Sequence, residues 1–228
     1  FVKSEKFNKP TPAEIAYWGG YFFYHNRLHR NYQDDISLHY YLLASKDGIT
    51  IGKRYFKHEN NKEDYPFSPS GHNLYDNNSK LYYCRDFDNI VYQIHEDSVV
   101  PRFRINLPNP LPASMIEERP NEMSLLRSGY SLGITDIYEY GGLLFFRFVK
   151  DGYIWSCLYN VEESKQVYCA KRIKFLDSSL IDTIDGIYKD CFYSILTPEY
   201  LDYAFSENPL EDYPDLFKTY DVEGDNPV

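Results

Sequence analysis

Residues 134–175 have the sequence ITDIYEYGGLLFFRFVKDGYIWSCLYNVEESKQVYCAKRIKF, and this stretch decides the fold class. It predicts four β-strands in a row, because aromatic and β-branched residues fill the segments between short breaks. The breaks fall at 141–142, 150–152 and 162–164 and consist of Gly, Asp, Glu, Lys and Ser. Such residues favour tight turns, so each strand should pair with the next in an antiparallel meander.

Two units of similar size precede this stretch. Residues 14–56 predict strands on either side of Gly19-Gly20, a third at 36–44 and a fourth at 49–56, with a tight hairpin turn at Asp47-Gly48. The second unit predicts strands at 72–75, 80–85, 90–95 and 100–107. About forty residues with four strands is the size of one β-propeller blade.

We therefore predict an all-β protein, a partial β-propeller of four-stranded antiparallel blades forming a single domain over residues 1–228. Residues 14–56, 72–107 and 134–175 are three blade-like units, and 181–196 begin a fourth that stays incomplete. A helical or irregular segment follows from Thr197.

An insertion at residues 108–133 separates the second and third blade-like units. It predicts short helical turns at 113–118 and 122–127. Long loops often carry function, but a cap over the end of the sheets is the reading that we favour. Arg127 and Tyr130 lie in this insertion and are candidate ligand-binding residues.

Composition narrows the function. The chain of 228 residues is 43% hydrophobic and 18% aromatic, which favours strands and a well-filled core. Its net charge of −10 repels nucleic acid, and Arg102 and Arg104 alone do not make a basic patch. No apolar run reaches the length of a membrane span. The chain opens at Phe1 without Met, so we expect that a targeting segment was removed or omitted.

The cysteines Cys84, Cys157, Cys169 and Cys191 form no CxxC pair, which argues against a zinc knuckle or a thioredoxin motif. Cys157 and Cys169 lie on neighbouring predicted strands and could face each other in a disulfide. We favour four buried free thiols, because free cysteine is among the most buried residue types.

Motifs for catalysis and metal binding are weak. His25 and His29 are candidate binding residues, but on a strand they stand about 13 Å apart and no third ligand joins them, so we expect no metal and no cofactor. The adjacent acids at 34–35, 117–118 and 162–163 point to opposite faces of a strand. Ser131 in GYSLG matches a nucleophile elbow by letters, but it follows a helical turn rather than a strand.

The aromatic surplus has two readings. Exposed Tyr and Trp side chains could stack on sugar rings or on peptide side chains. Large flat side chains also pack one sheet against the next. We favour packing for each aromatic residue, Trp18 and Trp155 included.

The stretch Arg85–Leu107, RDFDNIVYQIHEDSVVPRFRINL, resembles a motif of the six-bladed β-propeller proteins of Bacteroides-type bacteria. The closing segment at 225–228 also looks like the family's C-terminal N-P-V-L sequence. The residues that match in the stretch are Phe87, Asp88, Ile90, Tyr92, Ile94, Pro101, Phe103 and Ile105.

The resemblance implies an exported protein of the cell envelope (periplasm or outer surface), with a lipid anchor on a removed N-terminus as one form. Family members often occur beside polysaccharide-use machinery, and no catalytic residues carry over. Six blades need roughly 250 residues or more. This chain matches the C-terminal part of the family, so we expect it to be a fragment lacking N-terminal blades or to pair with a second copy that closes the ring.

Two functions remain open at this point. The first is a non-catalytic binding or scaffold protein of the bacterial cell envelope, with a protein or glycan ligand. The second is a carbohydrate-active enzyme that uses the central face of the propeller. The sequence shows no pair of carboxylates at catalytic spacing, so we favour binding.

Overall fold

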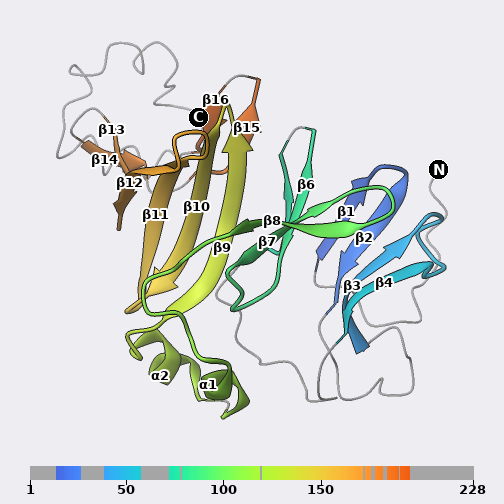
Figure 1. Cartoon of the computed structure of the whole chain (residues 1–228), viewed down its shortest axis with the longest axis horizontal. Helices are drawn as coiled ribbons and strands as arrows, with labels where there is room; N and C mark the ends of the chain where they lie inside the picture. The colour runs from blue at the N-terminus through green and yellow to red at the C-terminus, as the bar shows by residue number, and fades with distance from the viewer. Residues whose placement is uncertain are drawn as a thin grey trace, which may run out of the picture. The chain divides into compact units, whose positions relative to one another are not determined.

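The computed structural model describes residues 14–26, 39–57, 72–77, 79–118, 120–171, 173–175, 178–181, 184–189 and 191–195 (Figure 1). In these ranges the strands form three four-stranded sheets and two two-stranded sheets, and the only helices are two short ones. The predicted fold class, all-β with four-stranded antiparallel blades, is confirmed. The predicted helical or irregular segment from Thr197 lies outside the described residues.

The first sheet has the order β1-β2-β3-β4. Its strands alternate between two faces, and one face carries the buried side chains of Phe23, Leu42 and Ala44. The strands are β1 (Glu14–Trp18), β2 (Tyr21–His25), β3 (Tyr40–Ser45) and β4 (Lys53–Lys57).

The tight turn predicted at Asp47-Gly48 is wrong. β4 begins at Lys53 rather than at Ile49, because the Asp47 carboxylate organises a wider loop between β3 and β4. Its Oδ1 accepts hydrogen bonds from the main-chain N–H of Ile49 at 2.8 Å and of Thr50 at 2.7 Å. These hydrogen bonds lower the pKa of Asp47 well below its usual range, and they keep residues 49–50 out of the ladder.

The second sheet has the order β5-β6-β7-β8 and matches the strands predicted for residues 72–107 within a few positions. At the β6–β7 turn, Asp88 Oδ1 accepts hydrogen bonds from the main-chain N–H of Asn89 and Ile90. The strands are β5 (Leu74–Asp76), β6 (Leu81–Cys84), β7 (Ile90–Ile94) and β8 (Val99–Arg104).

Aromatic side chains pack the first sheet against the second. Phe56 stacks on Tyr83 with ring centroids 5.6 Å apart and meets Tyr92 at 4.5 Å. Trp18 packs against the same cluster, which confirms its predicted packing role. The buried members of the cluster are Phe23, Leu42, Ala44, Leu74, Leu81, Tyr83, Tyr92 and Ile94.

The insertion forms α1 (Ala113–Glu117) and α2 (Glu122–Leu126), which confirms both predicted helical turns. Asn121 caps α2 by accepting a hydrogen bond from the N–H of Ser124 at 2.9 Å. Leu125 of α2 is buried with Leu132 and Val149, so the insertion covers one end of the strands that follow, as the cap reading predicted. Neither helix is long and apolar enough to cross a membrane.

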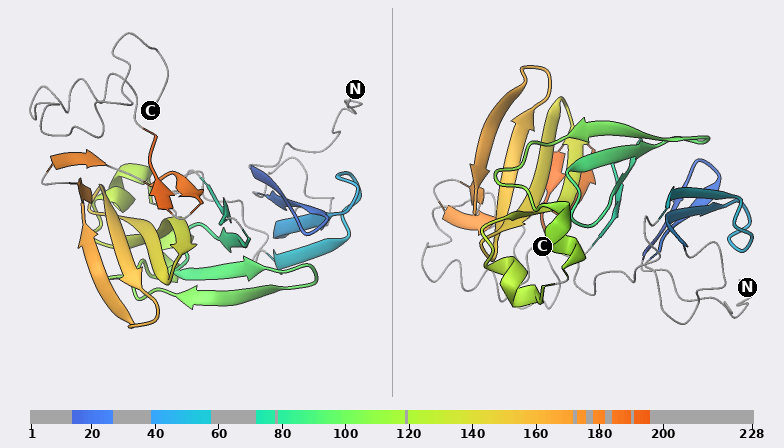
Figure 2. Two further views of the ribbon diagram at one scale, coloured as in Figure 1. Left: turned by 90° about the horizontal axis from the view of Figure 1, so that it is seen from above. Right: turned by 60° about the horizontal axis from the view of Figure 1, so that its bottom comes forward.

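The third sheet has the order β12-β11-β10-β9 and is drawn in yellow to orange in Figure 2. The last predicted strand, residues 165–175, ends at Ala170 instead. Ile173 and Phe175 pair with Ile181 and Ser178 in a separate hairpin. The strands of the sheet are β9 (Ser131–Tyr140), β10 (Leu143–Lys150), β11 (Tyr153–Asn160) and β12 (Lys165–Ala170).

Two hairpins follow the third sheet. The first joins β13 (Ile173–Phe175) to β14 (Ser178–Ile181), and the second joins β15 (Gly186–Tyr188) to β16 (Cys191–Tyr193). The chain divides into two compact units, residues 1–136 with 148–152 and residues 137–147 with 153–228. The single domain predicted over residues 1–228 stays a prediction.

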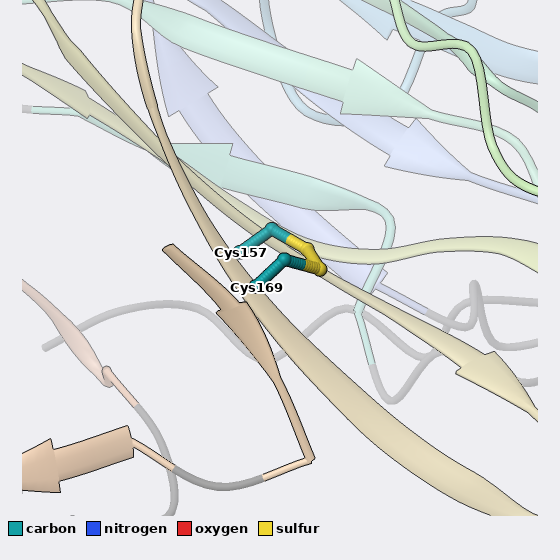
Figure 3. The surroundings of a disulfide bond; sticks show 2 residues. All are labelled: Cys157 and Cys169. Carbon is teal, nitrogen blue, oxygen red and sulfur yellow. A yellow bond between two sulfur atoms is a disulfide. The ribbon is translucent and has the colours of Figure 1, made fainter. Parts of the chain in front are cut away.

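A disulfide joins Cys157 of β11 to Cys169 of β12 (Figure 3). The two residues are direct partners in the antiparallel register, which brings their side chains within bonding reach. The prediction of four free thiols is therefore wrong for this pair. Cys84 is buried and free, and burial raises its thiol pKa well above the usual value, whereas Cys191 is free and exposed.

Gly133 is a position where we expect substitution to be costly. Its φ is +96°, and a Cβ there would lie 2.7 Å from Phe87 Cα. Gly133→Ala should therefore lower the free energy of unfolding by about 3 kcal/mol or more, because a left-handed residue and a backbone clash add together. Urea unfolding followed by circular dichroism would measure the loss.

Gly20 is the matched control for this prediction. Its φ is +79°, but nothing lies within 4 Å of a Cβ placed there. Gly20→Ala should lower the free energy of unfolding by only about 1 kcal/mol, because the positive φ is strained for alanine but no clash is added. Equal losses for the two variants would show that the contact with the β6–β7 turn does not constrain Gly133.

Candidate functional site

Hydrogen bonds place the first strands of successive sheets side by side. Glu14 at the start of β1 accepts hydrogen bonds at Oε2 from the N–H of Asn73 at 2.6 Å and of Leu74 at 2.9 Å, where β5 begins. In β5, Tyr75 donates its hydroxyl proton to the carbonyl of Thr135 in β9. β1 and β5 therefore start at the same end of their sheets.

The β6–β7 turn shows that β9 starts at this end too. The N–H of Ile134, near the start of β9, donates to the carbonyl of Asp88 in that turn at 3.1 Å. Strands of a meander reverse direction at each step, so every second connection returns to the same end. We call this the connection end: β2, β4, β6, β8 and β10 finish there, and β3, β5, β7, β9 and β11 begin there.

The connection end is the candidate functional site. Among the described connections, the longest is the insertion with α1 and α2, and it lies at this end. The opposite end has mostly tight turns, such as those at 19–20 and 141–142. Binding residues concentrate on long connections that a rigid sheet positions, so this asymmetry points to one end of the molecule.

Arg85 and Asp88 form a half-buried ion pair at the connection end. Asp88 Oδ2 accepts hydrogen bonds from Arg85 Nε at 2.9 Å and from Nη2 at 2.6 Å. The guanidinium also lies over the rings of Phe56 and Tyr92, at 5.3 and 6.0 Å from their centroids. Burial lowers the pKa of Arg85, but Asp88, Tyr92 and Tyr83 together raise it by more, so the pKa of the guanidinium is raised and it stays protonated. The pair fixes the turn between β6 and β7.

His25 is a packed core histidine. It is 1% exposed at the end of β2, and its Nδ1 lies 3.1 Å from the Tyr83 hydroxyl. Burial raises the pKa of Tyr83 well above its usual value. His29, the other half of the predicted pair, lies outside the described residues. Within the described ranges, no three His, Cys, Asp or Glu side chains are grouped to hold a metal.

The two predicted binding residues of the insertion have different surroundings. Arg127 is exposed just after α2, whereas Tyr130 packs against the cluster of Leu125, Leu132 and Val149. The structure puts both at the connection end, where His25 of β2 also lies. Their role in binding stays a prediction.

Ser131 is a structural residue rather than a nucleophile at an elbow. It begins β9, which follows α2 after residues 127–130, so the helix precedes the strand, as the sequence indicated. Its hydroxyl donates a hydrogen bond to the carbonyl of Pro108 and closes the base of the insertion.

Sequence reasoning missed the polar contacts that join the sheets. Glu14 approaches His72 as well as two main-chain N–H groups, with Oε1 3.3 Å from His72 Nδ1. A carboxylate at the first position of a strand, followed by apolar residues, was a signal that could have found it. Arg85 and Asp88 both lie in the Arg85–Leu107 motif, and their spacing across a turn suits an ion pair.

These features define a class of protein. Four-stranded antiparallel meanders with their first strands side by side, two of them packed face to face, are blades of a β-propeller. The chain belongs to the 6-bladed beta-propeller family, whose family model matches residues 14–179. The family predicted from Arg85–Leu107 is thereby confirmed.

A solved structure shows the same fold. It is a crystal structure of a Bacteroides fragilis protein named "Putative exported protein", with a TM-score of 0.71 and 16% identity. The match covers 95% of this chain and 63% of that one, so the chain spans less than two thirds of the neighbour's length. No protein of curated function matches the sequence.

Removal of the Asp88 charge should destabilise the second sheet. In Asp88→Asn the side chain can still accept from the turn N–H groups, but its amide faces the Arg85 donors. We expect a loss of about 2–3 kcal/mol in the free energy of unfolding, less than for a fully buried pair. Chemical denaturation at neutral pH would measure it.

Asp97→Asn is the control, because Asp97 is also paired with a cation, Lys53, at 3.1 Å but its side chain is 92% exposed. That substitution should cost at most about 0.5 kcal/mol. If Asp88→Asn were equally mild, the Arg85–Asp88 pair would not be what holds the turn.

Proposed function

We propose that this chain is part of a non-catalytic binding or scaffold propeller of the bacterial cell envelope, with its ligand at the connection end. The observation that carries the proposal is the insertion with α1 and α2, the longest described connection, which lies at that end. Rigid sheets hold such segments in fixed positions, which is how binding surfaces are built on β scaffolds. A glycan is the ligand class that we favour.

Two observations support export. The name of the Bacteroides fragilis neighbour describes an exported protein. The Cys157–Cys169 disulfide also suits an oxidising compartment outside the cytosol, where such bonds persist. A lipid anchor is one form of envelope attachment that the family resemblance implies.

An enzyme acting on carbohydrate is the alternative. Such an enzyme needs two carboxylates about 5–10 Å apart that are free to act on a glycosidic bond. Two acids of the connection end are already engaged, because Glu14 accepts from main-chain N–H groups and Asp88 holds Arg85. Binding therefore suits these residues better than hydrolysis.

A glycan array probed with the intact chain tests the proposal. We expect binding to at least one glycan, weakened severalfold by Arg127→Ala at the connection end and unchanged by Arg102→Ala, an exposed arginine on β8. Silence across the array together with tight binding to a purified envelope protein would defeat the glycan version. Release of shorter sugars from a bound glycan would favour the enzyme.

The first sheet also has a face that suits a further blade. In β5 both faces are covered, with Leu74 at 7% and Tyr75 at 3% exposure. In β1 the described residues cover the face toward the second sheet, whereas on the other face Ile15 is 53% and Tyr17 65% exposed. We infer that another four-stranded sheet, supplied by a second copy, covers this face and helps to complete the ring.

The mass of the protein in solution tests ring completion. Light scattering after gel filtration should give a dimer that Tyr17→Glu converts to monomer, because the charge would be buried against an apolar sheet. Met123→Glu, at an exposed site on α2, is the control and should leave the dimer intact. A well-behaved monomer of the unaltered chain would contradict the inference.

A further inference from the structure

An aromatic and basic cluster lies at the connection end of the third sheet. Lys171 Nζ lies 3.4 Å from the ring centroid of Tyr153 and 5.8 Å from that of Trp155. Tyr153 is 53% exposed, and Trp155 is half-buried beside it. We call Tyr153, Trp155 and Lys171 the Lys171 platform.

The strand pattern explains why these three residues meet. Tyr153 and Trp155 are two positions apart on β11, so they share a face of the sheet. Ser156 pairs with Ala170, and this register puts Lys171 opposite Trp155. Two positions further along the same face, the Cys157–Cys169 disulfide ties β12 to β11. The platform is therefore built on a cross-linked strand pair rather than on a loop.

Lys171 differs from Lys53 and Arg85 in its charge partners. Lys53 pairs with Asp97 and Arg85 pairs with Asp88. Among the described residues, Lys171 has no carboxylate partner, and its Nζ lies over the rings of Tyr153 and Trp155. An ammonium group has three donors, so this side chain can bind an anion without first breaking an ion pair.

The local charge is opposite to that of the whole chain. The net charge is −10, yet the sequence at 171–174 is Lys-Arg-Ile-Lys. A densely charged polyanion would be repelled by the protein as a whole. A ligand with sparse negative charge and a large C–H surface suits one ammonium beside an exposed aromatic ring.

We propose that the Lys171 platform binds a uronic acid residue of a polysaccharide. The Lys171 ammonium donates hydrogen bonds to the sugar carboxylate, and the Tyr153 ring packs against the C–H face of the sugar. Trp155 supports the Tyr153 side of the platform and limits where the ammonium can lie. This inference rests on the proposed glycan-binding function and deepens it by naming the ligand class.

A second lysine–tyrosine pair in the chain allows a test of whether the cluster has only a structural role. Lys189 lies over the ring of Tyr188 at 5.2 Å, and Tyr188 is 62% exposed, so this pair has the same residue types on another strand end. Among the described residues, Lys189 contacts one ring rather than two. If a lysine–tyrosine pair only stabilises a strand end, both pairs should behave alike in binding.

Calorimetric titration with oligogalacturonate, oligoguluronate and oligoglucuronate tests the proposal, each compared with its methyl ester. The ester keeps the sugar ring and removes the charge. We expect at least one acid to bind, with its ester weaker by about tenfold, the effect of losing a hydrogen bond to a charged group. Binding of the acid should also weaken as salt is raised.

Variants separate the two parts of the platform. Lys171→Gln should weaken binding of the acid about tenfold and leave binding of the ester unchanged. Tyr153→Ala should weaken binding of both ligands severalfold. Lys189→Gln and Tyr188→Ala are the matched controls and should change neither. Circular dichroism and urea unfolding would check that each exposed substitution leaves the fold intact.

The outcomes separate this inference from the proposed function. Equal binding of acid and ester, or an acid affinity unchanged by Lys171→Gln, would overturn the uronic acid site. If neutral glycans bound and none of the three acids bound, the uronic acid site would be overturned as well, whereas the glycan-binding function would stand. A failure of acids, esters and the glycan array together would overturn both.

Discussion

The packing of aromatic rings between the first two sheets is the constraint on which much of this structure depends. A four-stranded sheet has two faces, and each must be covered if it is apolar. Tyr83 of β6 is fully buried and meets His25 and Phe56 of the first sheet. Because Tyr83 is held from the facing sheet, the position of β6 is fixed, and with it the turn that carries Arg85 and Asp88.

That turn connects packing to the candidate site. The carbonyl of Asp88 receives the N–H of Ile134, while Phe87 approaches so closely that only glycine suits position 133. The start of β9 is therefore positioned by the end of the second sheet. Since the insertion with α1 and α2 packs on Leu132, the order of dependence runs from ring packing to turn, from turn to strand, and from strand to insertion.

Sequence alone predicted the repeating part of this fold. Short apolar segments between turn residues indicated twelve strands in three sheets, and residues 113–118 and 122–127 indicated the short helical turns. The errors fell where one side chain competes with the pattern. Asp47 binds N–H groups that would otherwise extend β4, and Ile173 and Phe175 pair with a later strand rather than prolonging β12. The disulfide depends on the register of β11 with β12. The symmetric spacing of Cys157 and Cys169 about the turn allowed that register, but it did not favour a disulfide over free thiols.

The candidate site was harder to predict for a physical reason. Contacts such as Glu14 with Asn73 and Tyr153 with Lys171 join residues whose approach depends on which strands lie side by side. A lysine beside an aromatic residue has no periodic signature, so the pattern of strands could not single it out. In a propeller each blade contributes its connections to a shared end, and three blades present only part of that surface. A ligand that contacts the remaining blades too would bind this chain more weakly than it binds a complete ring, since each added contact raises affinity without further loss of rigid-body freedom.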